Sequence, residues 1–131
     1  MLGMSLLFSP AYAGDAPLTI DGARTVDADG VIGLISAEPE LVILDNRKIE
    51  DFNAGAIEGA TRLIDTEMSA ETLAKSVPTK ATALLFYCNG LKCGRAANAV
   101  KMATGWGYSK VSYYALGMDD WVKKGLPVVK H

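Results

Sequence analysis

The sequence ALLFYCNGLKCGRAA spans residues 83–97 and decides most of what can be predicted about this chain. It begins with an apolar run, continues through a short loop that has a cysteine at each end, and ends in small residues with helical spacing. A continuous apolar run bounded by a turn is typical of a strand buried on both faces of a parallel sheet. The pattern therefore predicts a strand over 83–87, a loop that carries Cys88 and Cys93, and a helix over about 95–104.

Strand and helix signals alternate along the rest of the chain. Asp27 and Thr66 are polar residues of the kind that cap helices, and each lies shortly before a segment with helical character. The alternation predicts an α/β domain with a central, mainly parallel five-stranded sheet and helices on both faces. The other expected strands are 25–26, 41–44, 60–64 and 111–114, and the other expected helices are 28–37, 48–53, 69–75 and 119–124.

Composition limits the classes of function. The chain has 131 residues, half of them hydrophobic, which is enough for one domain with a real core. Its formal net charge is -2 and its basic residues are dispersed, so we expect neither a nucleic-acid partner nor a membrane-surface partner. Two cysteines and a single histidine, His131, carry no metal-binding spacing, so no metal and no cofactor are expected. The position of that histidine at the end of the chain also argues against a Cys–His nucleophilic pair.

Residues 1–13 have the pattern of a secretory signal peptide. Their apolar run is closed by Ala11–Tyr12–Ala13, a small-residue cleavage pattern, although a basic segment before the run is missing. The run is too short to span a bilayer, which takes about 20 apolar residues. We expect a signal peptide over 1–13, an N-terminal extension over 14–23 and one domain over 24–131. An exported protein of this kind would sit in an oxidising compartment such as a bacterial periplasm, and without export it would be cytoplasmic.

Three segments in the right order resemble the single-domain rhodanese, or thiosulfate:sulfurtransferase-like, family. They cover about residues 24–129, and three ordered segments are more specific than one short motif. Ala56, Glu58 and Leu116 depart from the usual family residues. The matching residues are Leu44–Asp45–Asn46–Arg47 with Glu50–Asp51–Phe52, Gly55, Ile57 and Gly59–Ala60; then Phe86–Tyr87–Cys88; and last Gly107–Tyr108, Val111, Gly117, Trp121 and Gly125–Leu126–Pro127.

The resemblance implies that Cys88 takes a sulfane sulfur from an anionic donor such as thiosulfate and passes it on from a persulfide. Six residues separate Cys88 from Arg95, so this loop is about two residues longer than the family's C-x-x-G-x-R loop. The loop amides, the start of the helix near Gly94 and the cations Lys92 and Arg95 are the groups that could favour a thiolate. The residues expected to bind substrate are Asn89, Gly90, Leu91, Lys92, Cys93, Gly94 and Arg95.

Several of these residues also have plain structural interpretations. Cys93 is a passive loop residue, a resolving thiol or half of a disulfide with Cys88, and the spacing does not choose among the three. Arg95 either contacts substrate or ties the loop to a carboxylate. Asp45 and Arg47 fit best as a structural polar network at a strand end that supports the site.

Three classes of function remain open on the sequence. The leading one is a sulfurtransferase with a small-molecule donor and acceptor, or with a protein thiol as acceptor. A second is a thiol–disulfide redox protein that cycles Cys88 and Cys93. A third is a module that binds or carries sulfur without turnover. A cysteine phosphatase or arsenate reductase fits least, because those enzymes need five residues between the cysteine and the arginine, and here there are six.

Overall fold

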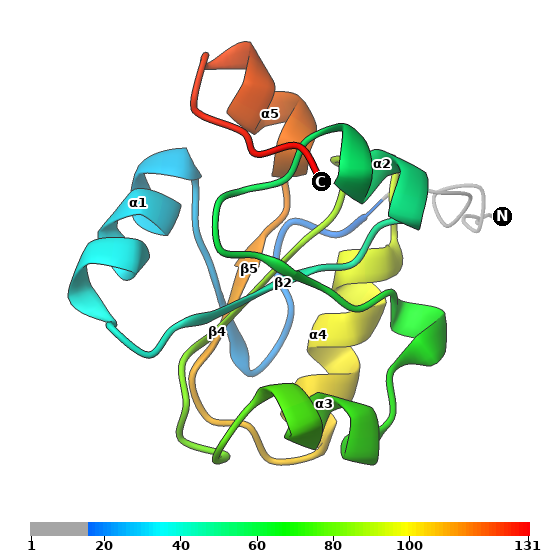
Figure 1. Ribbon diagram of the computed structural model, residues 1–131. Coiled ribbons are helices and arrows are strands. Elements are labelled where there is room, and N and C mark those ends of the chain that lie inside the picture. The colour runs from blue at the N-terminus through cyan, green and yellow to red at the C-terminus, as the bar shows by residue number, and fades with distance from the viewer. Residues whose placement is uncertain (1–15) are drawn as a thin grey trace, which may run out of the picture.

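The computed structural model describes residues 16–131, so the predicted signal segment lies outside the described residues. Five strands form one sheet in the order β1-β5-β4-β2-β3, and every pair is parallel. The α/β architecture with a five-stranded parallel sheet and helices on both faces is therefore confirmed (Figure 1). The elements are β1 Ala23–Thr25, α1 Ala28–Ala37, β2 Val42–Asp45, α2 Ile49–Ala54, β3 Thr61–Arg62, η2 Asp65–Glu67, α3 Ala70–Ser76, β4 Leu84–Tyr87, α4 Arg95–Gly105, β5 Val111–Tyr114 and α5 Gly117–Lys123.

The central strand β4 is formed by the apolar run that directly precedes Cys88. All four of its residues are buried, and it pairs with β2 on one side and with β5 on the other. A strand with neighbours on both edges and helices on both faces has no solvated side, which is why its sequence shows no polar alternation. The register places Asp45 opposite Tyr87, so the carboxyl ends of β2 and β4 meet at one edge of the sheet.

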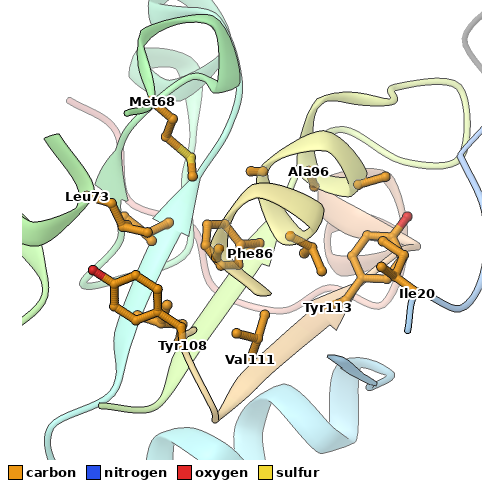
Figure 2. Packing of buried hydrophobic residues seen from close by; sticks show 14 of the residues in the cluster. Ile20, Met68, Leu73, Phe86, Ala96, Tyr108, Val111 and Tyr113 are labelled. Carbon is orange, nitrogen blue, oxygen red and sulfur yellow. The ribbon is translucent and has the colours of Figure 1, made fainter. Parts of the chain in front are cut away.

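Two apolar clusters fill the space between the sheet and its helices. On one face, α3 and α4 pack on Phe86, Val111 and Tyr113 (Figure 2). On the other face, α1 and α5 cover Tyr87 and Tyr114. The alanines of α4 are buried, and their small side chains let the helix lie close to the sheet. This packing holds the start of α4 at the end of β4.

Local signals explain most element boundaries, with one correction. The Asp27 carboxylate accepts a hydrogen bond of 2.8 Å from the amide of Gly30, so this predicted N-cap of α1 is confirmed. The prediction of Thr66 as a cap is wrong, because Thr66 lies inside the 3-10 turn η2. Ser69 caps α3 instead, in a reciprocal capping box with Thr72. Among residues 16–131, none of the helices combines the length and the apolar character needed to cross a bilayer.

Candidate active site

Cys88 follows β4 directly and lies at the carboxyl edge of the sheet, where its residue is 3% exposed. The first turn of α5 holds the backbone at this point. The amide of Met118 donates to the carbonyl of Cys88 over 3.0 Å, and the amide of Asp119 donates to the carbonyl of Asn89 over 2.8 Å. The start of the loop is therefore fixed by a helix that is almost 30 residues further along the chain.

The loop returns on itself and joins its two cysteines. Cys88 and Cys93 form a disulfide with their Cα atoms 6.2 Å apart, and the amide of Cys93 donates to the carbonyl of Gly90 over 3.0 Å. The sequence left this pairing open, because a five-residue step brings two cysteines together only if the loop curls. Cys93 is partly exposed, so the disulfide joins a buried cysteine, Cys88, to a more accessible one.

Beneath the loop, a buried ion pair joins the ends of β2 and β4. Asp45 accepts from Arg47 at Nε over 3.0 Å and at Nη2 over 2.8 Å, a bidentate arrangement. The phenol of Tyr87 donates to the same carboxylate over 2.5 Å. All three residues are buried, so the carboxylate of Asp45 accepts these hydrogen bonds from inside the protein and not from the loop.

The charges of this cluster shift the pKa of its members. Burial lowers the pKa of the Arg47 guanidinium, but the hydrogen bonds and negative charge of Asp45 outweigh it and raise the pKa overall. Burial, followed by the charge of Asp45, raises the pKa of the Tyr87 phenol. Arg47 is therefore a fixed cation and Tyr87 a neutral donor, so neither is suited to act as a base for Cys88.

Asn89 connects this cluster to the loop. Its side-chain oxygen accepts from Nη1 of Arg47 over 3.3 Å, and its side-chain nitrogen donates to Asp51 over 3.2 Å. Together with Met118 and Asp119, these residues line a groove of about 500 Å³ beside the loop. Arg47 thus contacts the loop through Asn89, and Asp45 is connected to the loop through Arg47.

Arg95 forms an ion pair with a carboxylate, which is the structural one of its two interpretations from the sequence. Its Nη1 lies 3.1 Å from the Asp65 carboxylate, and Asn98 donates to the other oxygen of that carboxylate over 3.1 Å. The pair ties the first turn of α4 to η2. A third of the Arg95 side chain is still exposed.

The remaining loop residues differ in exposure. Leu91 and Lys92 are exposed at the loop tip, and Gly94 is half-buried at the N-cap position of α4. Gly90 is buried, and a side chain there would meet the Asp119 carboxylate at 2.7 Å. The loop is thus anchored at both ends, and its tip, with one apolar and one basic side chain, faces solvent.

Two residues near Cys88 were named only as part of the family resemblance, and no role in the site was predicted for either. Gly117 approaches the backbone of the loop, and its φ of 62° favours glycine. Asn46 follows Asp45, and its amide donates to the carbonyl of Tyr87, so the parallel register places it beside Cys88. Its side-chain nitrogen donates to the carbonyl of Leu63 over 2.8 Å, whereas its buried side-chain oxygen has no hydrogen-bond partner within residues 16–131. Neither residue carries a local sequence signal of such a position.

The chain matches the model of one protein family, described as the Rhodanese-like domain, over residues 27–124. It is 29% identical over 98 residues to the uncharacterized protein YibN of Escherichia coli (strain K12), a match that covers 74% of this chain and 66%, just under two thirds, of that protein. The fold is similar to the crystal structure of the BH2092 protein from Bacillus halodurans, with a TM-score of 0.71, 22% identity and coverage of 82% of this chain and 77% of that one. It is also similar to the polysulfide-sulfur transferase homodimer from Wolinella succinogenes, with a TM-score of 0.66, 21% identity and coverage of 84% and 80%.

Proposed function

Because this chain belongs to the rhodanese-like domain family, we propose that it is a sulfurtransferase that uses a persulfide on Cys88. The donor is an anion with a sulfane sulfur, such as thiosulfate, and the acceptor is a thiophile such as cyanide or a thiol. The observation that carries the proposal is the position of Cys88 at the carboxyl end of the central strand, beneath a loop that leads into the start of α4. A relative whose name includes polysulfide-sulfur transferase has a similar fold, which supports the same class of chemistry.

The chemistry requires a thiolate at Cys88. The thiolate attacks the outer sulfur of thiosulfate, a new sulfur–sulfur bond forms, and sulfite leaves with the electron pair of the broken bond. A free cysteine thiol has a pKa of about 8.5, so the site must favour the anion. The positive end of α4, which begins at Arg95, and the nearby charge of Lys92 are the groups that do so in our proposal. The Cys88–Cys93 disulfide must be reduced before this step can begin.

Thiol–disulfide exchange is the second candidate, and the Cys88–Cys93 bond is the observation that favours it. Such a protein would pass two electrons between its dithiol and a partner without ever carrying sulfur. It needs both cysteines, whereas uptake of sulfur needs only Cys88. The two functions therefore differ in what the reduced protein gains from a sulfane donor.

The mass of the intact Cys93→Ser variant after thiosulfate treatment tests the proposal, because this variant has no partner for a disulfide within the chain. A gain of one sulfur that disappears on reduction, and that is absent when Cys88 is also changed to Ala, is the expected result. An unchanged mass with thiosulfate and with inorganic polysulfide would reject sulfur transfer. Oxidation of the wild-type dithiol by a disulfide substrate would then favour the second candidate.

We also propose export through the 1–13 segment, supported by the Ala11–Tyr12–Ala13 pattern. An oxidising compartment would be compatible with the disulfide. Expression of the full chain in a bacterial host, followed by fractionation and N-terminal sequencing, tests it. A periplasmic product that begins near Gly14 is expected, and an uncleaved cytoplasmic product would refute export.

A further inference from the structure

We propose that Cys93 is the resolving thiol of the reaction: it displaces the sulfane sulfur from the Cys88 persulfide, so that the protein releases this sulfur as sulfide. This inference rests on the proposed function and makes it more specific. A thiol in the same loop, rather than an external thiophile, attacks the persulfide. The external partner is then a dithiol reductant, which receives no sulfur and only restores the two thiols.

The geometry for an internal reaction is already present in the folded chain. Cys93 Sγ reaches Cys88 Sγ while the turn between them is closed by the hydrogen bond from Cys93 to Gly90. The start of the loop is held by the first turn of α5, and the carbonyl of Leu91 accepts from the amide of Ala16 over 2.6 Å. A reacting pair that is held in this way avoids the entropy loss of a bimolecular encounter.

The burial of Cys88 favours attack on its persulfide by Cys93 over attack by an external thiol. Cys88 is 3% exposed, so a bulky thiol has little access to a sulfur that Cys88 carries. Cys93, whose sulfur is bonded to Cys88, is partly exposed. The residue bonded to Cys88 in the folded chain is thus the one placed to react with its persulfide.

The step balances without an added oxidant. The Cys93 thiolate attacks Sγ of the Cys88 persulfide, the Cys88–Cys93 bond forms, and the outer sulfur leaves with the electron pair of the broken bond as HS⁻. The two cysteine sulfurs lose two electrons in total, and the sulfane sulfur gains the same two. The proton of the persulfide leaves with the sulfide. The product of this step is the disulfide that the structure contains.

The cycle closes when a dithiol attacks the accessible sulfur of Cys93. Cys88, which packs in one cluster with Ala96 and Ala97 of the first turn of α4, then leaves as a thiolate. The positive end of the helix favours this thiolate, and a good leaving thiolate speeds exchange. The second thiol of the reductant releases Cys93 and becomes part of a disulfide in the reductant. The net reaction converts thiosulfate and a dithiol into sulfite, sulfide and a disulfide.

Single-turnover measurements on the reduced protein test this inference. The wild type, Cys93→Ser and Cys88→Ser are reduced, freed of reductant without oxygen, and mixed with thiosulfate in the absence of any other thiol. Sulfite, sulfide and the intact mass are then followed. The two single-cysteine variants are matched controls, because the chain has only two cysteines and each variant keeps one.

The expected results separate the three proteins. The wild type releases sulfite and about one equivalent of sulfide, and its mass ends two hydrogens below that of the reduced chain. Cys93→Ser releases sulfite, keeps one added sulfur and yields less than about a tenth of the wild-type sulfide. Cys88→Ser releases neither product. The rate of sulfide release from the wild type does not change on dilution, because the step is intramolecular.

The failure of this inference differs from the failure of the proposed function. The role of Cys93 alone would be overturned if the wild type released sulfite but kept the persulfide, with a Cys93 thiol that still reacts with an alkylating agent. Equal sulfide release by the wild type and Cys93→Ser would also overturn it. Absence of sulfite with thiosulfate, together with absence of any sulfur adduct with inorganic polysulfide, would overturn both.

Discussion

Gly117 lies directly against the backbone of Cys88, so closely that a Cβ atom at Gly117 would collide with the Cys88 carbonyl oxygen. The same Cβ would stand 2.8 Å from the carbonyl carbon of Asn89. This approach lets the amide of Met118 reach the Cys88 carbonyl over 3.0 Å. A residue without a side chain is therefore the reason that α5 can anchor the candidate active loop.

We expect Gly117→Ala to displace the loop and to lower both stability and the rate of sulfur uptake at Cys88. Backbone strain at its φ of 62° and the collision with backbone atoms add, for a loss of about 2–5 kcal/mol in the free energy of unfolding. Gly125→Ala is the matched control, because Gly125 has a φ of 70° and its Cβ would meet nothing within 4 Å. Urea unfolding and the rate of sulfite release measure the two effects. Equal losses in both variants would show that the close approach is unimportant.

Removal of the charge from Asp45 should be more damaging than removal of a surface carboxylate. Asp45→Asn leaves the buried guanidinium of Arg47 without its bidentate partner. Breaking one half of a buried ion pair costs about 3–5 kcal/mol, so we expect a loss of that size in urea unfolding. Glu38→Gln, which affects an exposed pair with Lys110 at 4.0 Å, should cost less than about 1 kcal/mol. A loss at Asp45 as small as that at Glu38 would contradict the structural role of the cluster.

The phenol of Tyr87 supports the same carboxylate and gives a separate prediction. It donates to Asp45 and accepts from the amide of Ile57 over 3.2 Å, so Tyr87→Phe removes both hydrogen bonds at a buried position. The expected loss is about 1–3 kcal/mol in urea unfolding, because buried groups are left without partners. Tyr108→Phe is a suitable control, since it removes a hydroxyl from another buried tyrosine of the opposite cluster. An unchanged stability for Tyr87→Phe would mean that Asp45 and Ile57 find other partners.

The sequence predicted the parts of the fold that depend on local pattern. The apolar run before Cys88 became the central strand, and the small residues after Gly94 became α4, because burial on both faces of a sheet leaves a pattern that is visible in the sequence. Thr66 was wrong as a cap because the chain first makes a 3-10 turn, and Ser69 then offers a cap with a reciprocal partner in Thr72.

The parts of the site that depend on tertiary placement could not be predicted. Tyr87 fitted a core position, and only the register with β2 brings its hydroxyl to Asp45. The contact of Gly117 with Cys88 joins two residues almost 30 positions apart, and no local pattern specifies it. The Cys88–Cys93 bond needed the curl of the loop, which the hydrogen bond from Cys93 to Gly90 closes.

Acid should remove the stabilisation that the Asp120 carboxylate of α5 provides through its hydrogen bonds from Lys124 and Tyr114. Hydrogen bonds from Lys124 and then from Tyr114 lower the pKa of Asp120. A lowered folded-state pKa gives a stabilisation that is present above the unfolded pKa of about 3.9 and is lost as the pH falls through the folded value. Asp120→Asn should therefore be less stable than the wild type at neutral pH, by less than about 1 kcal/mol, and the gap should close below about pH 3. Urea unfolding across this range measures it, and a gap that widens in acid would contradict the prediction.

The redox state of the loop should control sulfur uptake, because Cys88 has no thiol while it is bonded to Cys93. Wild-type protein isolated in air should release no sulfite from thiosulfate. Protein reduced by a dithiol that is then removed without oxygen should release about one equivalent and stop, because the internal reaction with Cys93 forms the disulfide again. The onset of transfer by Cys93→Ser should not require that treatment, because its Cys88 has no partner in the chain. Sulfite release measures both proteins, thiocyanate formation in the presence of cyanide measures repeated turnover by Cys93→Ser, and titration of free thiols before the assay reports the state of the loop. Equal sulfite release by the oxidised and the reduced wild type would mean either that the donor or cyanide opens the disulfide, or that Cys88 does not carry the sulfur. The mass of the oxidised protein after treatment with thiosulfate alone distinguishes these two outcomes.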